Sequence, residues 1–122
     1  MVIFDTNILI ELYRGNTQLK KQIEEIPEKV FYVSTISAAE FLAGAKDKDD
    51  LKRLERYLNN YTPLPLTAGI SQIFIGLYER FLLSHRPQIP DTLIAATAIY
   101  YNLPLLTLNK RDFQFIPGIQ LF

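Results

Sequence analysis

Four acidic residues, each close to a short apolar run, have the types and positions needed to hold a divalent cation. With the runs that they follow or open, they are Asp5 after residues 2–4, Glu40 soon after 30–33, Asp91 before 93–96, and Asp112 after 105–107. If these runs belong to one parallel sheet, the acids lie just past its carboxyl edge, where open α/β sheets bind ligands. Converging carboxylates repel one another, so the cluster needs protons or a cation. A cation makes the chain a candidate metal-dependent enzyme.

The segments around these acids alternate between strand-like and helix-like patterns, which is typical of a parallel sheet flanked by helices. Apolar runs predict strands at 2–4, 30–33, 105–107 and 119–122, and Pro63 and Pro65 predict that 62–66 is an edge strand. Caps and amphipathic spacing predict helices at 8–13, 17–26, 47–59 and 68–83. They also predict a helix that follows 34–37 and continues through Ala45, and another that starts at Pro90. We expect one domain over residues 1–122, a three-layer α/β/α fold with a central, mainly parallel sheet of about five short strands. Residues 2–4 should form its centre, between 30–33 and 105–107.

The composition limits the classes of protein to consider. The 13 basic and 13 acidic residues balance, so no overall positive field indicates nucleic acid, although a local patch and a metal can supply the attraction. The absence of cysteine excludes disulfides, thiolate nucleophiles and thiolate zinc sites. Neither a signal peptide nor an apolar run of about 18 residues is apparent. We therefore expect an intracellular, cytoplasmic protein.

Each acid also has a purely structural explanation. Asp5 is a good helix cap, and Ser37 three residues before Glu40 forms a capping box. Asp91 suits the first turn of a helix, where the helix dipole favours an acid, and Asp112 suits a turn. Any one of these explanations is adequate alone. Four acids at four corresponding junctions favour a common site.

Four segments of the chain, in order, resemble the motifs of a PIN domain. They are Val2-Ile3-Phe4-Asp5-Thr6-Asn7, Ser34-Thr35-Ile36-Ser37-Ala38-Ala39-Glu40, Asp91-Thr92-Leu93-Ile94-Ala95-Ala96, and Leu105-Leu106-Thr107-Leu108-Asn109-Lys110-Arg111-Asp112. The compact size is similar to that of the VapC-like toxins. The resemblance implies a ribonuclease that uses Mg²⁺ (or Mn²⁺), is held inactive by an antitoxin and forms a homodimer. One departure from the family pattern is Pro90 before Asp91. Proline is well tolerated at the start of a helix.

The resemblance also suggests a role for each acid. Hard oxygen ligands suit Mg²⁺, and a metal-bound water can attack a phosphodiester. We expect Asp5 and Asp91 to be the main metal anchors, joined by Asp112, with Glu40 orienting or deprotonating the attacking water, directly or through a second metal.

Polar neighbours of these acids are candidates to hold the carboxylates or contact phosphate, namely Thr6, Asn7, Thr107 and Asn109. A capping or turn role explains these four equally well. Lys110 and Arg111 are candidate RNA-backbone contacts, with a solvated turn as the alternative. His85, the sole histidine, follows a helix, so paired-histidine catalysis is excluded and a polar surface position explains it better. The helix around 73–83 is apolar on more than one face, which suits either the core or a partner.

Two other functions compete with this interpretation. A phosphatase of the haloacid-dehalogenase type also begins with a strand and an aspartate, but it needs a second aspartate where this chain has Asn7. A PIN-like binding module without catalysis would normally lack some of the acids, and here all four are present. A Rossmann nucleotide site is excluded because no glycine-rich loop follows the first strand.

Overall fold

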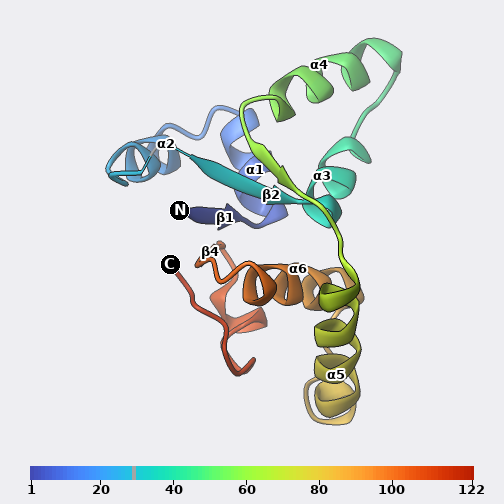
Figure 1. Ribbon diagram of the computed structural model, residues 1–122. Coiled ribbons are helices and arrows are strands. Elements are labelled where there is room, and N and C mark those ends of the chain that lie inside the picture. Colours follow the sequence, from blue (N-terminus) through green and yellow to red (C-terminus); the bar gives the residue numbers. More distant parts are fainter. Residues whose placement is uncertain (29) are drawn as a thin grey trace.

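The computed structural model describes residues 1–28 and 30–122, in which strands and helices alternate (Figure 1). In chain order the elements are β1 (Val2–Phe4), α1 (Thr6–Tyr13), α2 (Thr17–Glu24), β2 (Phe31–Ser34), α3 (Thr35–Leu42), α4 (Lys48–Leu58), β3 (Thr62–Leu64), α5 (Ala68–His85), α6 (Ile89–Tyr100), β4 (Leu105–Leu106) and the 3₁₀ helix η1 (Lys110–Asp112). The alternation predicted from the sequence is confirmed.

The sheet is parallel throughout and has the strand order β3-β2-β1-β4. Ile3 of β1 lies opposite Tyr32 on one side and Leu105 on the other. The prediction that residues 2–4 form the centre is confirmed. The edge position of β3, predicted from its prolines, is also confirmed.

The predicted strand at 119–122 forms only a single bridge, between Leu105 and Leu121. The chain lies beside β4, where Leu105 donates its N–H to the Gln120 carbonyl and accepts from the Phe122 N–H. β4 has only two residues, so a longer ladder cannot form. The sheet of the described residues therefore has four strands rather than about five, which leaves the fold class unchanged.

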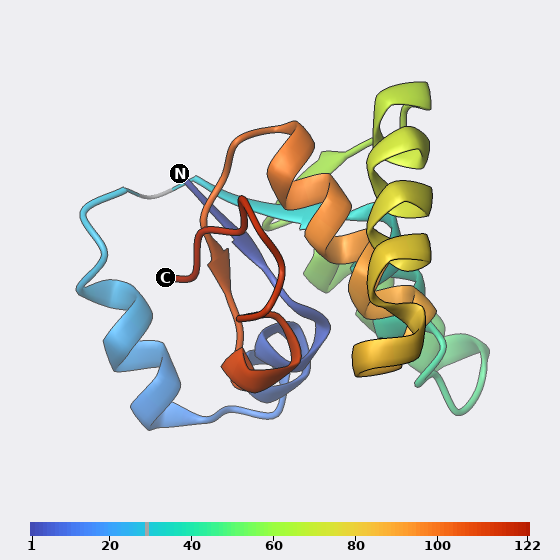
Figure 2. The ribbon, with the colours of Figure 1, turned by 90° about the horizontal axis from the view of Figure 1, so that it is seen from below.

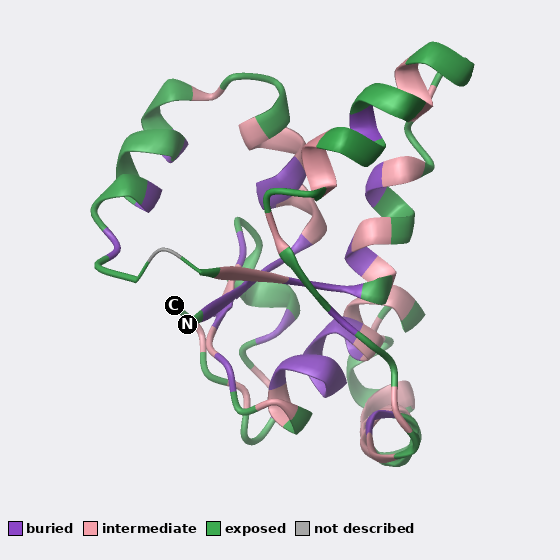
Figure 3. Ribbon diagram, turned by 45° about the horizontal axis from the view of Figure 1, so that its top comes forward, coloured by how far each residue is buried: buried purple, intermediate pink, exposed green. Residues whose placement is uncertain are grey.

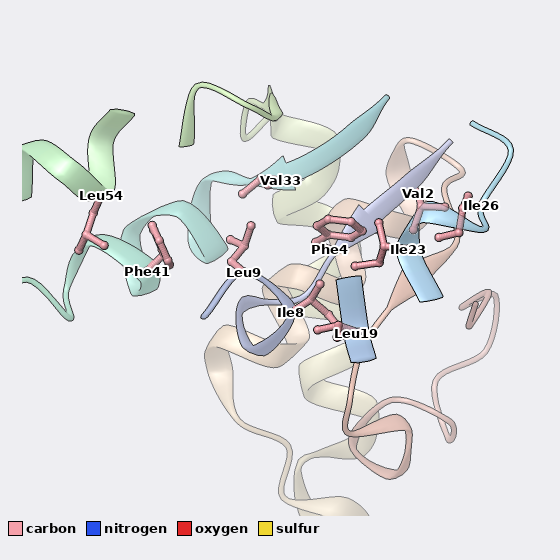
Figure 4. Packing of buried hydrophobic residues seen from close by; sticks show 10 residues of the cluster. All are labelled: Val2, Phe4, Ile8, Leu9, Leu19, Ile23, Ile26, Val33, Phe41 and Leu54. Atoms are coloured by element: carbon pink, nitrogen blue, oxygen red, sulfur yellow. The ribbon is translucent and has the colours of Figure 1, made fainter. Parts of the chain in front are cut away.

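Alternate residues of β1, β2 and β4 enter two hydrophobic cores, one on each face of the sheet. Val2 and Phe4 pack with α1 and α2, where Leu9 and Ile23 are among the buried residues (Figure 4). Ile3 points to the other face and packs with the second core, which includes Ile94 of α6 and Phe113. This alternation follows from the period of two in a strand, and it produces the three layers.

Helices α5 and α6 pack against one another on the second face of the sheet (Figure 2). The middle of α6 is buried, whereas most of α5 is exposed or half-buried (Figure 3). Gly69 lets the ring of Tyr100 lie against the first turn of α5, because a Cβ at this position would clash with the ring. This close approach joins the start of α5 to the end of α6, and Asp91 lies in the first turn of α6.

Candidate active site

The candidate site begins at the point where the strand order reverses. From β1 the chain moves outward to β2 and β3, and it later returns to place β4 on the other side of β1. In open α/β sheets the carboxyl ends of two such strands border a natural crevice. Asp5 follows β1 directly, and Thr107 follows β4 directly, so both residues lie at this crevice.

Two hydrogen bonds hold the buried carboxylate of Asp5. Its Oδ1 accepts from the Thr6 N–H at 2.8 Å, which caps α1, and its Oδ2 accepts from Thr107 Oγ1 at 2.7 Å. Thr107 Oγ1 itself accepts from the Asn109 N–H at 3.0 Å, which directs its hydroxyl proton toward Asp5. The capping interpretation of Asp5 is therefore correct, but it accounts for only one of the two carboxylate oxygens.

The environment of Asp5 disfavours its negative charge. Burial raises the pKa of its carboxyl, and the charges of Glu40 and Asp112 raise it further, while the Thr107 and Thr6 hydrogen bonds lower it. Burial outweighs the hydrogen bonds, so the net change in pKa is upward. Within the described part of the chain, no cationic side chain contributes to this balance.

Glu40 reaches the same region from α3. Thr6 Oγ1 donates to its Oε1 at 2.7 Å and also lies 3.2 Å from the hydroxyl oxygen of Ser37, which is buried. The predicted capping box between Ser37 and Glu40 is wrong, because α3 begins three residues earlier and Ser34 caps it by accepting from the Ser37 N–H. Glu40 therefore lies in the body of α3, and its side chain contacts Thr6 of α1 instead of the N-terminus of its own helix.

Asp91 lies in the first turn of α6, as the helix-dipole interpretation predicts, with Pro90 beside it. Burial raises the pKa of its carboxyl to about 6, and the charges of Asp5, Asp112 and Glu40 also contribute, in that order. All four acids thus lie close enough to interact electrostatically. An isolated acid in a helix turn would have no such acidic neighbours.

Asp112 is the last residue of η1 and lines a cavity of about 410 Å³ together with Asp91. The cavity is formed by residues around the end of α5, the start of α6 and η1. Asp112 therefore lies in a short helical turn, as the turn interpretation predicts. It also lines the same cavity as Asp91.

The polar neighbours predicted from the sequence differ in what they contact. Thr6 and Thr107 contact Asp5 directly. Asn7 Oδ1 accepts from the Leu108 N–H at 3.4 Å and so connects α1 to the segment after β4. Asn109 contributes its backbone N–H to Thr107. These contacts connect the end of β1 to the end of β4, on either side of the crevice.

Within residues 1–28 and 30–122, no three acidic or histidine side chains are grouped tightly enough to form a ready-made metal site. The donor chemistry nevertheless fits a hard divalent cation, because carboxylate oxygens are the ligands that Mg²⁺ and Mn²⁺ prefer. The raised pKa values of Asp5 and Asp91 point the same way, since burial and the repulsion among the acids both disfavour the negative charges, and a bound cation would offset both effects.

Two residues beside the acids were not expected from the sequence. His85 and Arg86 line the cavity that holds Asp91 and Asp112, because the chain reverses direction between α5 and α6. Arg86 ends α5 in the left-handed region with φ of 47°. The short interval between two helical patterns was the only signal of this reversal, and it does not reveal which side chains face the cavity.

Residues 2–118 match the family model of the PIN domain. This chain is a member of the PIN-domain family. A relative named "Ribonuclease VapC" from Rickettsia bellii is 35% identical, and the alignment covers 98% of this chain and 93% of the relative. "Ribonuclease VapC19" from Mycobacterium tuberculosis is 32% identical, with 98% of each chain covered.

Solved structures agree with the assignment to the PIN-domain family. A toxin–antitoxin complex from Klebsiella pneumoniae contains a chain with 31% identity and a TM-score of 0.80, over 98% of this chain and 95% of that one. VapBC2 from Rickettsia felis, solved with a promoter DNA fragment, contains a chain with a TM-score of 0.87 over 100% of this chain and 98% of that one. Its identity is 22%, so it supports the fold alone. The predicted α/β/α PIN fold is confirmed.

Proposed function

We propose that this PIN domain is a metal-dependent ribonuclease that hydrolyses RNA phosphodiester bonds, and that it is the toxin of a VapBC-type toxin–antitoxin pair. The main support is the group of acids at the sheet crevice, where burial and mutual repulsion raise the pKa of Asp5 and Asp91. The relatives named "Ribonuclease VapC" give this site a reaction class.

Asp5, Asp91 and Asp112 are the residues that would hold Mg²⁺ or Mn²⁺, with Glu40 nearby on α3. A bound divalent cation activates water and neutralises the charge that develops on the phosphate. In this chain Thr107 and Thr6 keep the Asp5 carboxylate in one orientation through hydrogen bonds to its two oxygens. Such fixed contacts maintain the geometry of a metal ligand.

Glu40 is the group that would accept a proton from the attacking water. Its carboxylate is exposed, and it is oriented by the 2.7 Å hydrogen bond from Thr6 Oγ1. Thr6 contacts Asp5 through its backbone and Glu40 through its hydroxyl, so one residue aligns the metal anchor and the base. Histidine chemistry is not required by this mechanism.

The competing functions have less support. In the phosphatase alternative a second catalytic aspartate would occupy position 7, but Asn7 instead uses its side-chain oxygen to accept from Leu108. The inactive-module alternative predicts a site that has lost acids, whereas all four are present here and interact electrostatically. Neither alternative is needed to explain membership of the PIN-domain family.

The remaining parts of the proposal concern partners and setting. The Klebsiella pneumoniae neighbour is a toxin–antitoxin complex, which supports a cognate antitoxin for this chain. We also propose a homodimer and a single domain over residues 1–122 that acts in the cytoplasm. Among the helices of the described residues, none has the length and hydropathy to cross a membrane.

Cleavage of RNA by the purified protein tests the proposal. We expect cleavage with Mg²⁺ or Mn²⁺, no cleavage in excess EDTA, and recovery when metal is restored. The matched variants are Asp5→Asn, which keeps a capping oxygen, and Asp47→Asn, which alters a cap on α4 away from the site. Loss of activity in the second variant but not the first would contradict the assignment.

A further inference from the structure

The cavity beside the acids has the features of a nucleotide-binding subsite. It has a volume of about 410 Å³, and six of its lining residues carry the argument: His85, Arg86, Asp91, Arg111, Asp112 and Phe115. Two acids of the candidate active site thus share one hollow with two guanidinium groups and two rings. An RNA strand whose phosphate reaches the acids would pass through this hollow or beside it.

The two arginines are available to a phosphate. Among the ion pairs of the described residues, none involves Arg86 or Arg111, and both side chains are exposed. Guanidinium groups bind phosphate oxygens well because their geometry allows two parallel hydrogen bonds.

Two rings that line the same cavity are stacked on one another. The imidazole of His85 stacks on Phe115 with centroids 4.2 Å apart and planes 11° apart. The edge of Phe81 braces both rings, at 5.6 Å from His85 and 5.1 Å from Phe115. The Ser84 hydroxyl lies 2.7 Å from His85 Nδ1 and fixes the imidazole further. His85 is exposed while Phe115 is half-buried, so His85 is the outer layer of the stack.

We propose that this cavity binds the nucleotide next to the cleaved phosphodiester, with its base stacked on His85 and its phosphate paired with Arg86 and Arg111. The inference rests on the proposed ribonuclease function and assigns part of its substrate contact. A ring held in a fixed orientation can stack on any base, since every base has a π-face. Exposed arginines can bind the phosphates of the RNA backbone. His85 is then a binding residue, not a general acid or base.

The contribution of the arginines is tested by RNA binding as a function of salt. The full chain carrying Asp5→Asn, which should not cleave, is titrated into a labelled single-stranded RNA of random sequence and followed by fluorescence anisotropy. We expect Arg86→Gln and Arg111→Gln each to weaken binding and to reduce the slope of log affinity against log salt by about 0.7. The control Arg56→Gln removes the same charge from the exposed surface of α4 and should leave the slope unchanged.

The stacking contact is tested at His85 in the same Asp5→Asn background. His85→Ala should weaken RNA binding about five-fold or more, and His85→Phe should restore it, because it keeps a ring over Phe115. The chain has no tryptophan, so His85→Trp introduces a single tryptophan whose emission a stacked base should quench. Leu83→Trp, at a residue that is 82% exposed near the end of α5, is the control whose emission should change little.

The outcomes separate this inference from the function on which it rests. If wild-type protein cleaves RNA with metal, but the His85 and arginine variants bind RNA as tightly as the parent, the subsite is refuted and the ribonuclease remains. Unquenched emission from the His85→Trp protein at saturating RNA refutes the subsite in the same way. If His85→Ala lowers the melting temperature without weakening binding, the stack is only structural and the subsite is again refuted. Absence of both cleavage and binding in the wild type refutes both proposals.

Discussion

Thr107 Oγ1 donates a 2.7 Å hydrogen bond to Oδ2 of Asp5, joining residues 102 positions apart in the chain. The two residues follow adjacent parallel strands, so the contact spans the point where the strand order reverses. Because Asp5 is buried and disfavoured as an anion, this hydroxyl is one of two donors that keep its charged form accessible. The contact therefore connects the topology of the sheet to the chemistry of the proposed site.

Removing the Thr107 hydroxyl should weaken metal binding more than it weakens the fold. In Thr107→Val, the pKa of Asp5 should rise further and the carboxylate should lose its orientation. We expect about 10- to 100-fold weaker Mn²⁺ binding by calorimetry. The control is Thr97→Val, since Thr97 is a buried threonine whose hydroxyl bonds to the Leu93 carbonyl within α6. Equal metal affinity in the two variants would contradict the role given to Thr107.

Thr6 should affect turnover through Glu40. Thr6→Val removes the 2.7 Å hydrogen bond to Glu40 but keeps the backbone N–H that binds Asp5. Loss of one oriented proton-accepting group typically costs about 10²- to 10⁴-fold in rate, and mere misorientation should cost the lower part of that range. Single-turnover cleavage should be slowed while RNA affinity is retained.

Thr6→Ser is the matched control for the Glu40 contact, because serine keeps the hydroxyl and is also well tolerated at the first position of α1. It should recover most of the cleavage rate. A Thr6→Val protein that cleaves at the wild-type rate would show that Glu40 needs no such support.

The raised pKa of Asp91 predicts how metal-free stability depends on pH. Between the ordinary pKa of 3.8 and about 6, the folded protein binds more protons at this carboxyl than the unfolded chain does. Stability from this group is therefore present below pH 3.8 and is lost as the pH rises through about 6. The shift corresponds to at most about 3 kcal/mol, and contact with solvent reduces this to about 1 or 2.

Asp91→Asn isolates this effect because asparagine stays neutral at every pH. Without metal, the variant should be more stable than the wild type at pH 7, and the difference should vanish below pH 3.8, the ordinary pKa of the carboxyl. Saturating Mg²⁺ should stabilise the wild type and reverse the order at pH 7. Melting curves in EDTA and in Mg²⁺ measure both effects. A variant that is less stable than the metal-free wild type at pH 7 would contradict the repulsion around Asp91.

The sequence predicts the central strand, its two neighbours and the first-turn position of Asp91, because apolar runs and helix caps are local signals. It does not predict the start of α3, since both Ser34 and Ser37 are suitable caps and only the pairing of β2 selects Ser34. The prediction of a fifth strand at 119–122 is wrong, because β4 is too short to form a longer ladder with this segment. The residues at 119–122 carry no local signal of the length of β4.

The surroundings of the acids are harder to predict than the acids themselves. His85 looks like a polar surface residue in the sequence, and it is indeed exposed. Its stacking on Phe115 depends on how the turn after α5 meets the segment after η1, about 30 positions later. Contacts of this kind arise from tertiary packing, so they become visible only in the folded chain.

The chemistry of the RNA ends tests the central claim most directly. Purified protein is incubated with a labelled RNA in Mg²⁺, and the product ends are identified by their reactivity toward phosphatase, kinase and ligase. Water activated at the acids does not use the ribose hydroxyl as nucleophile, so we predict 5′-phosphate and 3′-hydroxyl ends, with no products from Asp5→Asn or in EDTA. Cyclic 2′,3′-phosphate ends, or undiminished cleavage in EDTA, would contradict a metal-dependent ribonuclease built on Asp5, Glu40, Asp91 and Asp112.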